Sequence, residues 1–117
     1  MDHLQISIEG TKDFLVMFLR GRIDIESSPN LRDQLHVLLR RQPAPVAIAV
    51  DLSAVDYMDT SGIATLVEAL KIARIGRIAL NLKGLQGRLL HLFQSTGIGT
   101  LFDTDGFAKT SSSTKVY

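Results

Sequence analysis

The residues with the chemistry for a functional site gather in one segment, Asp51-Leu52-Ser53-Ala54-Val55-Asp56-Tyr57-Met58-Asp59-Thr60-Ser61-Gly62. Two hydroxyl side chains, Thr60 and Ser61, follow Asp59 and precede an apolar pattern with helical spacing. We expect a buried strand to run into a loop that carries these hydroxyls to a helix N-terminus. Asp59 or Thr60 can cap the free N–H groups there, and this capping role is one interpretation of the segment.

A functional interpretation of the same segment is a phosphate acceptor. The carboxyl ends of strands and the helix N-termini that follow them form the usual site edge of an open α/β sheet. A phosphate on a hydroxyl at that edge is tolerated by the helix N–H groups. It would also add charge beside Asp56 and Asp59 and so alter the binding of a partner without unfolding the domain.

An enzyme is a poor fit to this sequence. Asp56 and Asp59 are a possible acid/base pair, but they are three residues apart and no nucleophile or base stands near them in the sequence. The chain has no Cys, which removes thiolate, disulfide and iron–sulfur chemistry, and its three His residues are far apart. We therefore predict no catalytic residues, no metal and no cofactor.

Composition points to one soluble domain. The chain has 117 residues, of which 45% are hydrophobic and 21% are charged, with a formal net charge of +1. The near-neutral charge weighs against nucleic acid as a direct partner. The longest uncharged apolar run, 14–19, is far shorter than the ~20 residues of a membrane span, and the N-terminus lacks the pattern of a secretory signal. We expect a cytoplasmic protein, a monomer or weak dimer, that does not bind a membrane directly.

Charge is distributed unevenly along the chain. Residues 1–59 hold nine acidic and six basic side chains, whereas residues 60–102 hold one acidic side chain, Glu68, and five basic ones. These bases are either solvated helix ends or a basic face near a partner or phosphate site.

Hydrophobic periodicity predicts strands alternating with helices. Solid apolar runs indicate strands buried on both faces, so Met17 and Phe18 are expected in the core. Ser28 is expected to cap the first helix, with Pro29 at its first position. The predicted strands are 4–8, 14–19, 46–51, 78–82 and 100–102, and the predicted helices are 28–41, 61–74 and 85–96.

The resulting order is β-β-α-β-α-β-α-β. Buried strands that alternate with helices pair in parallel through right-handed crossovers, and only the first hairpin is expected to be antiparallel. The fold class is therefore α/β, with a mixed, mostly parallel sheet and helices packed against it. We expect one small domain over residues 1–105 and a polar tail, a short helix or a frayed end, over residues 106–117.

Three motifs resemble those of the STAS domain family, especially bacterial anti-sigma factor antagonists. The central one is Asp51-Leu52-Ser53 followed by Tyr57-Met58-Asp59-Thr60-Ser61-Gly62. Gly21-Arg22-Ile23-Asp24 resembles the stretch after the family's second strand, and Phe93-Gln94-Ser95-Thr96-Gly97-Ile98 resembles the end of its third helix. The motifs occur in the family's order and span residues 4–102.

The resemblance implies a protein that binds an anti-sigma factor, itself a serine/threonine kinase, and thereby frees a sigma factor. The kinase would phosphorylate a hydroxyl after the motif Asp, and a serine/threonine phosphatase would reverse this. In the family the acceptor is usually the first such hydroxyl, here Thr60, with Ser61 as the alternative. The implied partner-binding residues are Arg22, Asp24, Asp56, Tyr57, Met58, Asp59, Ser61 and Gly62.

Arg22 departs from the family pattern, because Glu often stands at that place. The departure reverses one charge beside the implied binding surface and bears on the choice of partner. Two other functions remain open for such a domain: the cytoplasmic STAS subunit of a lipid-transport ABC complex, and a scaffold component of a stress-signalling assembly.

Overall fold

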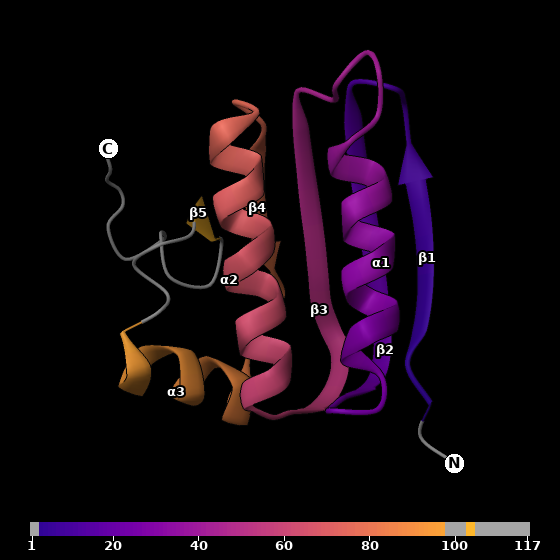
Figure 1. Cartoon of the computed structure of the whole chain (residues 1–117). Helices are drawn as coiled ribbons and strands as arrows, with labels where there is room; N and C mark the ends of the chain where they lie inside the picture. The colour runs from indigo at the N-terminus through magenta and orange to yellow at the C-terminus, as the bar shows by residue number, and fades with distance from the viewer. Residues whose placement is uncertain (1–2, 98–102, 105–117) are drawn as a thin grey trace.

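A computed structural model describes residues 3–97 and 103–104 of the chain (Figure 1). Its sheet has five strands in the spatial order β1-β2-β3-β4-β5, the last strand being only two residues long. β1 and β2 are antiparallel, and the other neighbouring pairs are parallel. The strands are β1 Gln5–Gly10, β2 Phe14–Ile23, β3 Ala47–Met58, β4 Ala79–Lys83 and β5 Asp103–Thr104, and the helices are α1 Ser28–Leu39, α2 Thr60–Ile75 and α3 Gly87–Thr96.

The order of elements along the chain agrees with the predicted one. α1 and α2 lie side by side over one face of the sheet, and α3 lies to the side of the carboxyl-terminal part of β3, next to the start of α2 (Figure 1). The core between sheet and helices is apolar, because each element turns its periodic apolar side chains inward. Its fully buried members include Met17, Leu19, Leu31, Leu35, Ile48, Val50, Leu66, Leu82 and Phe93.

β2 is covered on one face, not two. Leu15, Met17 and Leu19 are buried against the helices, whereas Phe14 is 60% exposed and Phe18 is 38% exposed. The prediction that Phe18 belongs to the core is therefore wrong. Side chains of a strand alternate between faces, and a solid apolar run does not reveal whether the second face is covered.

β3 is twice as long as expected, because it continues through Leu52–Met58, where a loop was predicted. This second half pairs with the end of β2, Arg22 opposite Tyr57 and Ile23 opposite Met58, after two register shifts. Gly21 accommodates the second shift with φ of +106°, and a Cβ there would lie 2.4 Å from the backbone oxygen of His3. Glycine is the residue that adopts this backbone conformation without strain.

The first helix begins differently from the prediction. Ser27, not Ser28, is the N-cap residue, and its hydroxyl makes no capping bond to the helix. Pro29 is the second residue of α1, and Leu31, Leu35, Leu38 and Leu39 form its buried face as predicted. The predicted strand at 100–102 and the tail at 106–117 lie outside the described residues, so the predicted domain boundary stays a prediction.

Candidate functional site

One residue, Asp59, joins β3 to α2. Its backbone is extended, and its carboxylate Oδ1 accepts hydrogen bonds from the backbone N–H groups of Ser61 (2.9 Å) and Gly62 (3.3 Å). The Asp59 N–H donates to the backbone oxygen of Ile23 at the end of β2 (3.1 Å). Asp59 therefore caps α2 as predicted and fixes the helix start to two neighbouring strands.

The two hydroxyls at the start of α2 have different environments. The Ser61 hydroxyl donates to Asp59 Oδ1 (2.5 Å), and the Ser61 side chain is half-buried. Thr60 is exposed, and its hydroxyl has no hydrogen-bond partner among the residues that the structure describes. Thr60 therefore presents a free hydroxyl at the first position of the helix, while Ser61 is engaged with the cap.

The hydrogen bonds that Asp59 accepts favour its charged form. The Ser61 hydroxyl is the largest influence that lowers the pKa of Asp59 below its ordinary value, and the backbone N–H groups of Gly62 and Ser61 act in the same direction. Desolvation of the carboxyl group and, to a smaller extent, the nearby charge of Asp24 raise the pKa and so oppose these hydrogen bonds. Asp59 is therefore a carboxylate at neutral pH, beside the free hydroxyl of Thr60.

A second carboxylate, Asp24, lies at the same edge because it follows β2 as Asp59 follows β3. Its Oδ1 accepts from the backbone N–H groups of Glu26 (3.0 Å) and Ser27 (3.1 Å), and the bond from Ser27 is the main cause that lowers the pKa of Asp24. The Ser27 hydroxyl donates to the backbone oxygen of Arg22 (2.8 Å). Ser27 thus holds the Asp24 turn in shape, a role that the sequence analysis missed.

Arg22 and Tyr57 form a stacked pair on adjacent strands. The Arg22 guanidinium lies 3.9 Å from the centre of the Tyr57 ring, and its Nε lies 3.6 Å from Asp24 Oδ2. Both side chains are about 40% exposed. The pairing across β2 and β3 places them together, so the predicted residues Arg22, Asp24 and Tyr57 form one continuous surface with a charge and an aromatic ring.

Met58 and Gly62 lie behind this surface. Both are buried, and a Cβ on Gly62 would come within 2.6 Å of Ile23 Cγ2 and 2.7 Å of Met58 Cγ. Gly62 therefore allows the first turn of α2 to approach the two strands closely. This packing sets the position of Thr60 relative to the sheet.

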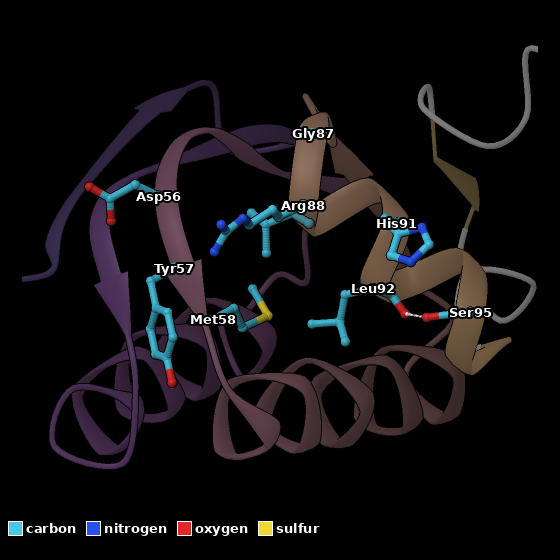
Figure 2. A pocket seen from close by; sticks show the side chains of 9 residues that line it. Asp56, Tyr57, Met58, Gly87, Arg88, His91, Leu92 and Ser95 are labelled. Carbon is cyan, nitrogen blue, oxygen red and sulfur yellow. Dashed lines mark hydrogen bonds between the residues drawn. The ribbon is translucent and has the colours of Figure 1, made fainter.

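A groove of about 590 Å³ lies between the end of β3 and α3. Figure 2 shows Met58 and Leu92 pointing toward each other across it, and Arg88 reaching from α3 toward β3. Asp56, on the β3 wall, points away from α3 (Figure 2). The sequence analysis placed Arg88 among the five basic residues of 60–102, either at a solvated helix end or on a basic face near a partner or phosphate site, and did not predict the groove.

Among residues 3–97, together with 103 and 104, no group of His, Asp and Glu side chains is arranged to hold a metal ion. No helix in this described part is long and apolar enough to cross a membrane.

A protein-family model described as the STAS domain matches residues 5–114. The chain belongs to the STAS domain family. This confirms the resemblance that the three motifs indicated.

Curated relatives of this STAS domain share one description. The anti-sigma-B factor antagonist of Listeria monocytogenes is 32% identical over 103 residues, which cover 86% of this chain and 89% of the relative. The protein of the same name from Bacillus subtilis is 31% identical over 101 residues, which cover 86% and 90%. Both relatives match along most of their length.

Solved structures confirm the α/β fold of this STAS domain. The anti-sigma factor antagonist SpoIIAA in its unphosphorylated form superposes with a TM-score of 0.74 over 91% of this chain and 92% of its own, at 18% identity. A putative anti-sigma factor antagonist from Thermotoga maritima gives a TM-score of 0.77 over 90% of each chain, at 14% identity. At these identities the likeness establishes the fold.

Proposed function

We propose that this STAS domain is an anti-sigma factor antagonist, a binding protein and not an enzyme, whose binding is switched by phosphorylation of Thr60. The observation that carries the proposal is the free, exposed Thr60 hydroxyl at the start of α2, directly after the capping residue Asp59. Two curated relatives named anti-sigma-B factor antagonist support the role. SpoIIAA, which shares the fold, has been solved in unphosphorylated and phosphorylated forms.

The hydrogen bonds favour Thr60 over Ser61 as the acceptor. Transfer of a phosphoryl group to Ser61 would remove the hydroxyl proton that binds Asp59 Oδ1 and would place the phosphate against that carboxylate. Modification of Thr60 disturbs no hydrogen bond among the described residues. Ser61 is then a positioning residue that holds Asp59 over the helix N-terminus.

A phosphate on Thr60 would act mainly on the partner. It carries about −1.5 to −2 charges at neutral pH. The positive end of the α2 helix dipole offsets part of this charge, so the domain stays folded. Together with Asp24 and Asp59 the phosphate would form a cluster of negative charge at one sheet edge, and an acidic partner surface would be repelled.

The partner of the unmodified form is an anti-sigma factor with serine/threonine kinase activity, and a serine/threonine phosphatase restores that form. The surface made by Arg22, Asp24 and Tyr57 lies at the same edge as Thr60 and is exposed enough to be contacted. Asp56 and Asp59 extend this surface along the end of β3. Met58, Ser61 and Gly62 support it from behind.

Substitution of Thr60 tests the switch. Thr60→Glu should weaken binding to the cognate kinase at least about tenfold, which corresponds to about 1.4 kcal/mol, because it places a charge where the phosphate would stand. Thr60→Ala should bind normally and resist release by ATP. Calorimetric titration measures both, and phosphopeptide mapping locates the phosphate.

The control is Ser61→Ala, which should remain a kinase substrate. A phosphate mapped to Ser61 would reassign the acceptor, and a phosphate on neither residue would refute the switch. Co-purification of an ABC ATPase, or gel filtration of a large particle, would instead favour the transport or scaffold function.

A further inference from the structure

Within residues 3–97 and 103–104, the second half of β3 has a strand neighbour on one side only. β4 pairs with Ala47–Asp51 and then ends, whereas β3 continues to Met58 along β2. On the β4 side the chain turns away at Gly84, and the Gln86 side chain donates to the backbone oxygen of Ser53 (3.2 Å). Beyond Ser53, the β3 edge faces α3 across the groove, and no strand among the described residues pairs with it on that side.

The groove combines an apolar floor with a wall that carries the cationic side chain of Arg88. Met58 and Leu92 supply the floor (Figure 2), and both are at least half-buried. Arg88 and His91 rise from α3, are exposed, and make no ion pair with any residue that the structure describes. α3 itself carries no acidic side chain. The carboxylate of Asp56 points away, so it does not neutralise Arg88 (Figure 2).

We propose that this groove binds an extended segment of a partner protein that alternates apolar and acidic side chains. The segment would add to the open edge of β3 through backbone hydrogen bonds, as in strand addition to other sheet edges. Alternate side chains of a strand point to opposite faces, so apolar ones can pack on Met58 and Leu92 while acidic ones meet Arg88. The proposal concerns a surface beside the Thr60 edge and holds whether or not Thr60 is phosphorylated.

Charge complementarity selects this occupant. An uncharged apolar segment would leave Arg88 without a counter-charge in a partly desolvated groove, and a basic segment would be repelled by it. A small anion would pair with Arg88 but would leave the apolar floor and the strand edge uncovered. An acidic and apolar strand satisfies all three features of the groove together.

The test is a nuclear magnetic resonance titration of the full chain with two synthetic octapeptides, one alternating Leu and Glu and the other alternating Leu and Lys. The Glu peptide should shift the backbone amides of residues 54–58 and 88–95. The Lys peptide should bind at least about tenfold more weakly. Equal affinity for both peptides, or shifts confined to other parts of the chain, would overturn the proposal.

Arg88→Glu should lower the affinity for the Glu peptide at least about tenfold and raise the affinity for the Lys peptide. The matched control is Arg41→Glu, which makes the same charge change at an exposed position beyond the far end of α1. Circular dichroism confirms that both variants fold. If both substitutions lowered the affinity for the Glu peptide equally, the effect would be due to net charge and the proposed binding site in the groove would be wrong.

Inorganic phosphate in large excess separates a peptide groove from a simple anion site. It should compete only weakly, because it covers neither the floor nor the strand edge. If phosphate reproduced all the shifts of the Glu peptide, the site would bind small anions and the proposed occupant would be wrong. Thr60→Glu should change the affinity for the Glu peptide by no more than about twofold. Failure of the groove proposal is therefore distinguishable from failure of the proposed phosphorylation switch at Thr60.

Discussion

The two hydroxyl side chains at the start of α2 differ in what they contact. Ser61 donates to the carboxylate that caps the helix, and Thr60 projects into solvent. The same bond lowers the pKa of Asp59 and so keeps a negative charge beside Thr60. Ser61 therefore helps to keep Asp59 charged, and Thr60 carries the exposed hydroxyl group.

Gly62 is the residue at which the site is most sensitive to an added methyl group. A Cβ there would come within 3.0 Å of Ile23 and Met58, so one of these side chains must move. Gly62→Ala should lower the free energy of unfolding by about 1–2 kcal/mol, because the cost of overpacking exceeds the gain in helix propensity. Urea denaturation measures this change.

Gly76→Ala is the control for that substitution. Gly76 ends the same helix with φ of −85°, and a Cβ there would find its nearest neighbour at 3.6 Å, an ordinary contact. The control should change the free energy of unfolding by less than about 0.5 kcal/mol. Similar losses for the two variants would show that close packing at Gly62 is not the cause.

Among the elements, β2 and β3 decide the geometry of the site. Their long parallel pairing brings Arg22 against Tyr57 and places Asp24 near Asp59. Periodicity alone predicted the order of strands and helices, and the motifs indicated the capped start of α2. Periodicity did not predict that β3 runs to Met58, because the polar residues Ser53 and Asp56 interrupt the apolar pattern. The segment becomes a strand because it pairs with β2, which is distant in the sequence.

The capped start of α2 gives the domain a pH-dependent stability. The pKa of Asp59 is lower in the folded state than in the unfolded state. The charged carboxylate therefore stabilises the fold at pH values above the unfolded-state pKa of Asp59, and this contribution is lost as the pH falls through the lowered folded-state pKa. Asp59→Asn keeps a capping side chain without the charge. The variant should unfold at lower urea concentration than the parent near neutral pH.

That difference should be smaller at about pH 3 than near neutral pH, because below the ordinary pKa of Asp the unfolded parent begins to take up a proton and the charge of Asp59 then contributes less to stability. Urea midpoints at the two pH values test the prediction. A difference independent of pH would mean that the Asp59 carboxylate contributes through its shape and not through its charge.

α1 and α2 are joined at their surface by Glu68, which accepts from Arg32 Nε (2.9 Å) and lies 3.4 Å from His36 Nε2. The hydrogen bond from Arg32 is the main cause that lowers the pKa of Glu68, so the contribution of this pair is present above the ordinary pKa of Glu and lost as the pH falls. A double-mutant cycle of Arg32→Ala and Glu68→Ala should give a coupling of about 0.5 kcal/mol, since both side chains are substantially exposed.

High salt should reduce that coupling, because screening weakens exposed ion pairs. Urea denaturation of the two single variants and the double variant, with and without added NaCl, provides the measurement. A coupling that is unchanged by salt would indicate packing between α1 and α2, not an ion pair.

At the scale of the whole molecule, α1 and α2 cover one face of the sheet and the site occupies one of its edges (Figure 1). The composition predicted one domain with little catalytic chemistry. The described residues form one sheet with its helices, and the absence of catalysis stays a prediction. The groove beside α3 was beyond prediction, because Met58 and Leu92 meet only once the chain has folded. The exposure of Phe14 and Phe18 was likewise not predictable from the sequence, because it depends on which face of the sheet the helices cover.

The junction at Asp59 connects β3 to α2 through a single residue, and this bears on the proposed phosphorylation of Thr60. Many kinases bind an extended peptide in their active site, but the proposed acceptor, Thr60, stands on a folded backbone held on both sides. A synthetic peptide of residues 54–66 is too short to form a stable helix alone. It should be phosphorylated far more slowly than the intact domain under the same kinase, as phosphate incorporation would measure.

Equal rates for peptide and domain would show that sequence alone suffices. If the rates differ as expected, the kinase recognises the folded structure around Thr60 and not the sequence alone. The rigid junction would then restrict phosphorylation to correctly folded molecules, since a misfolded molecule would not be phosphorylated.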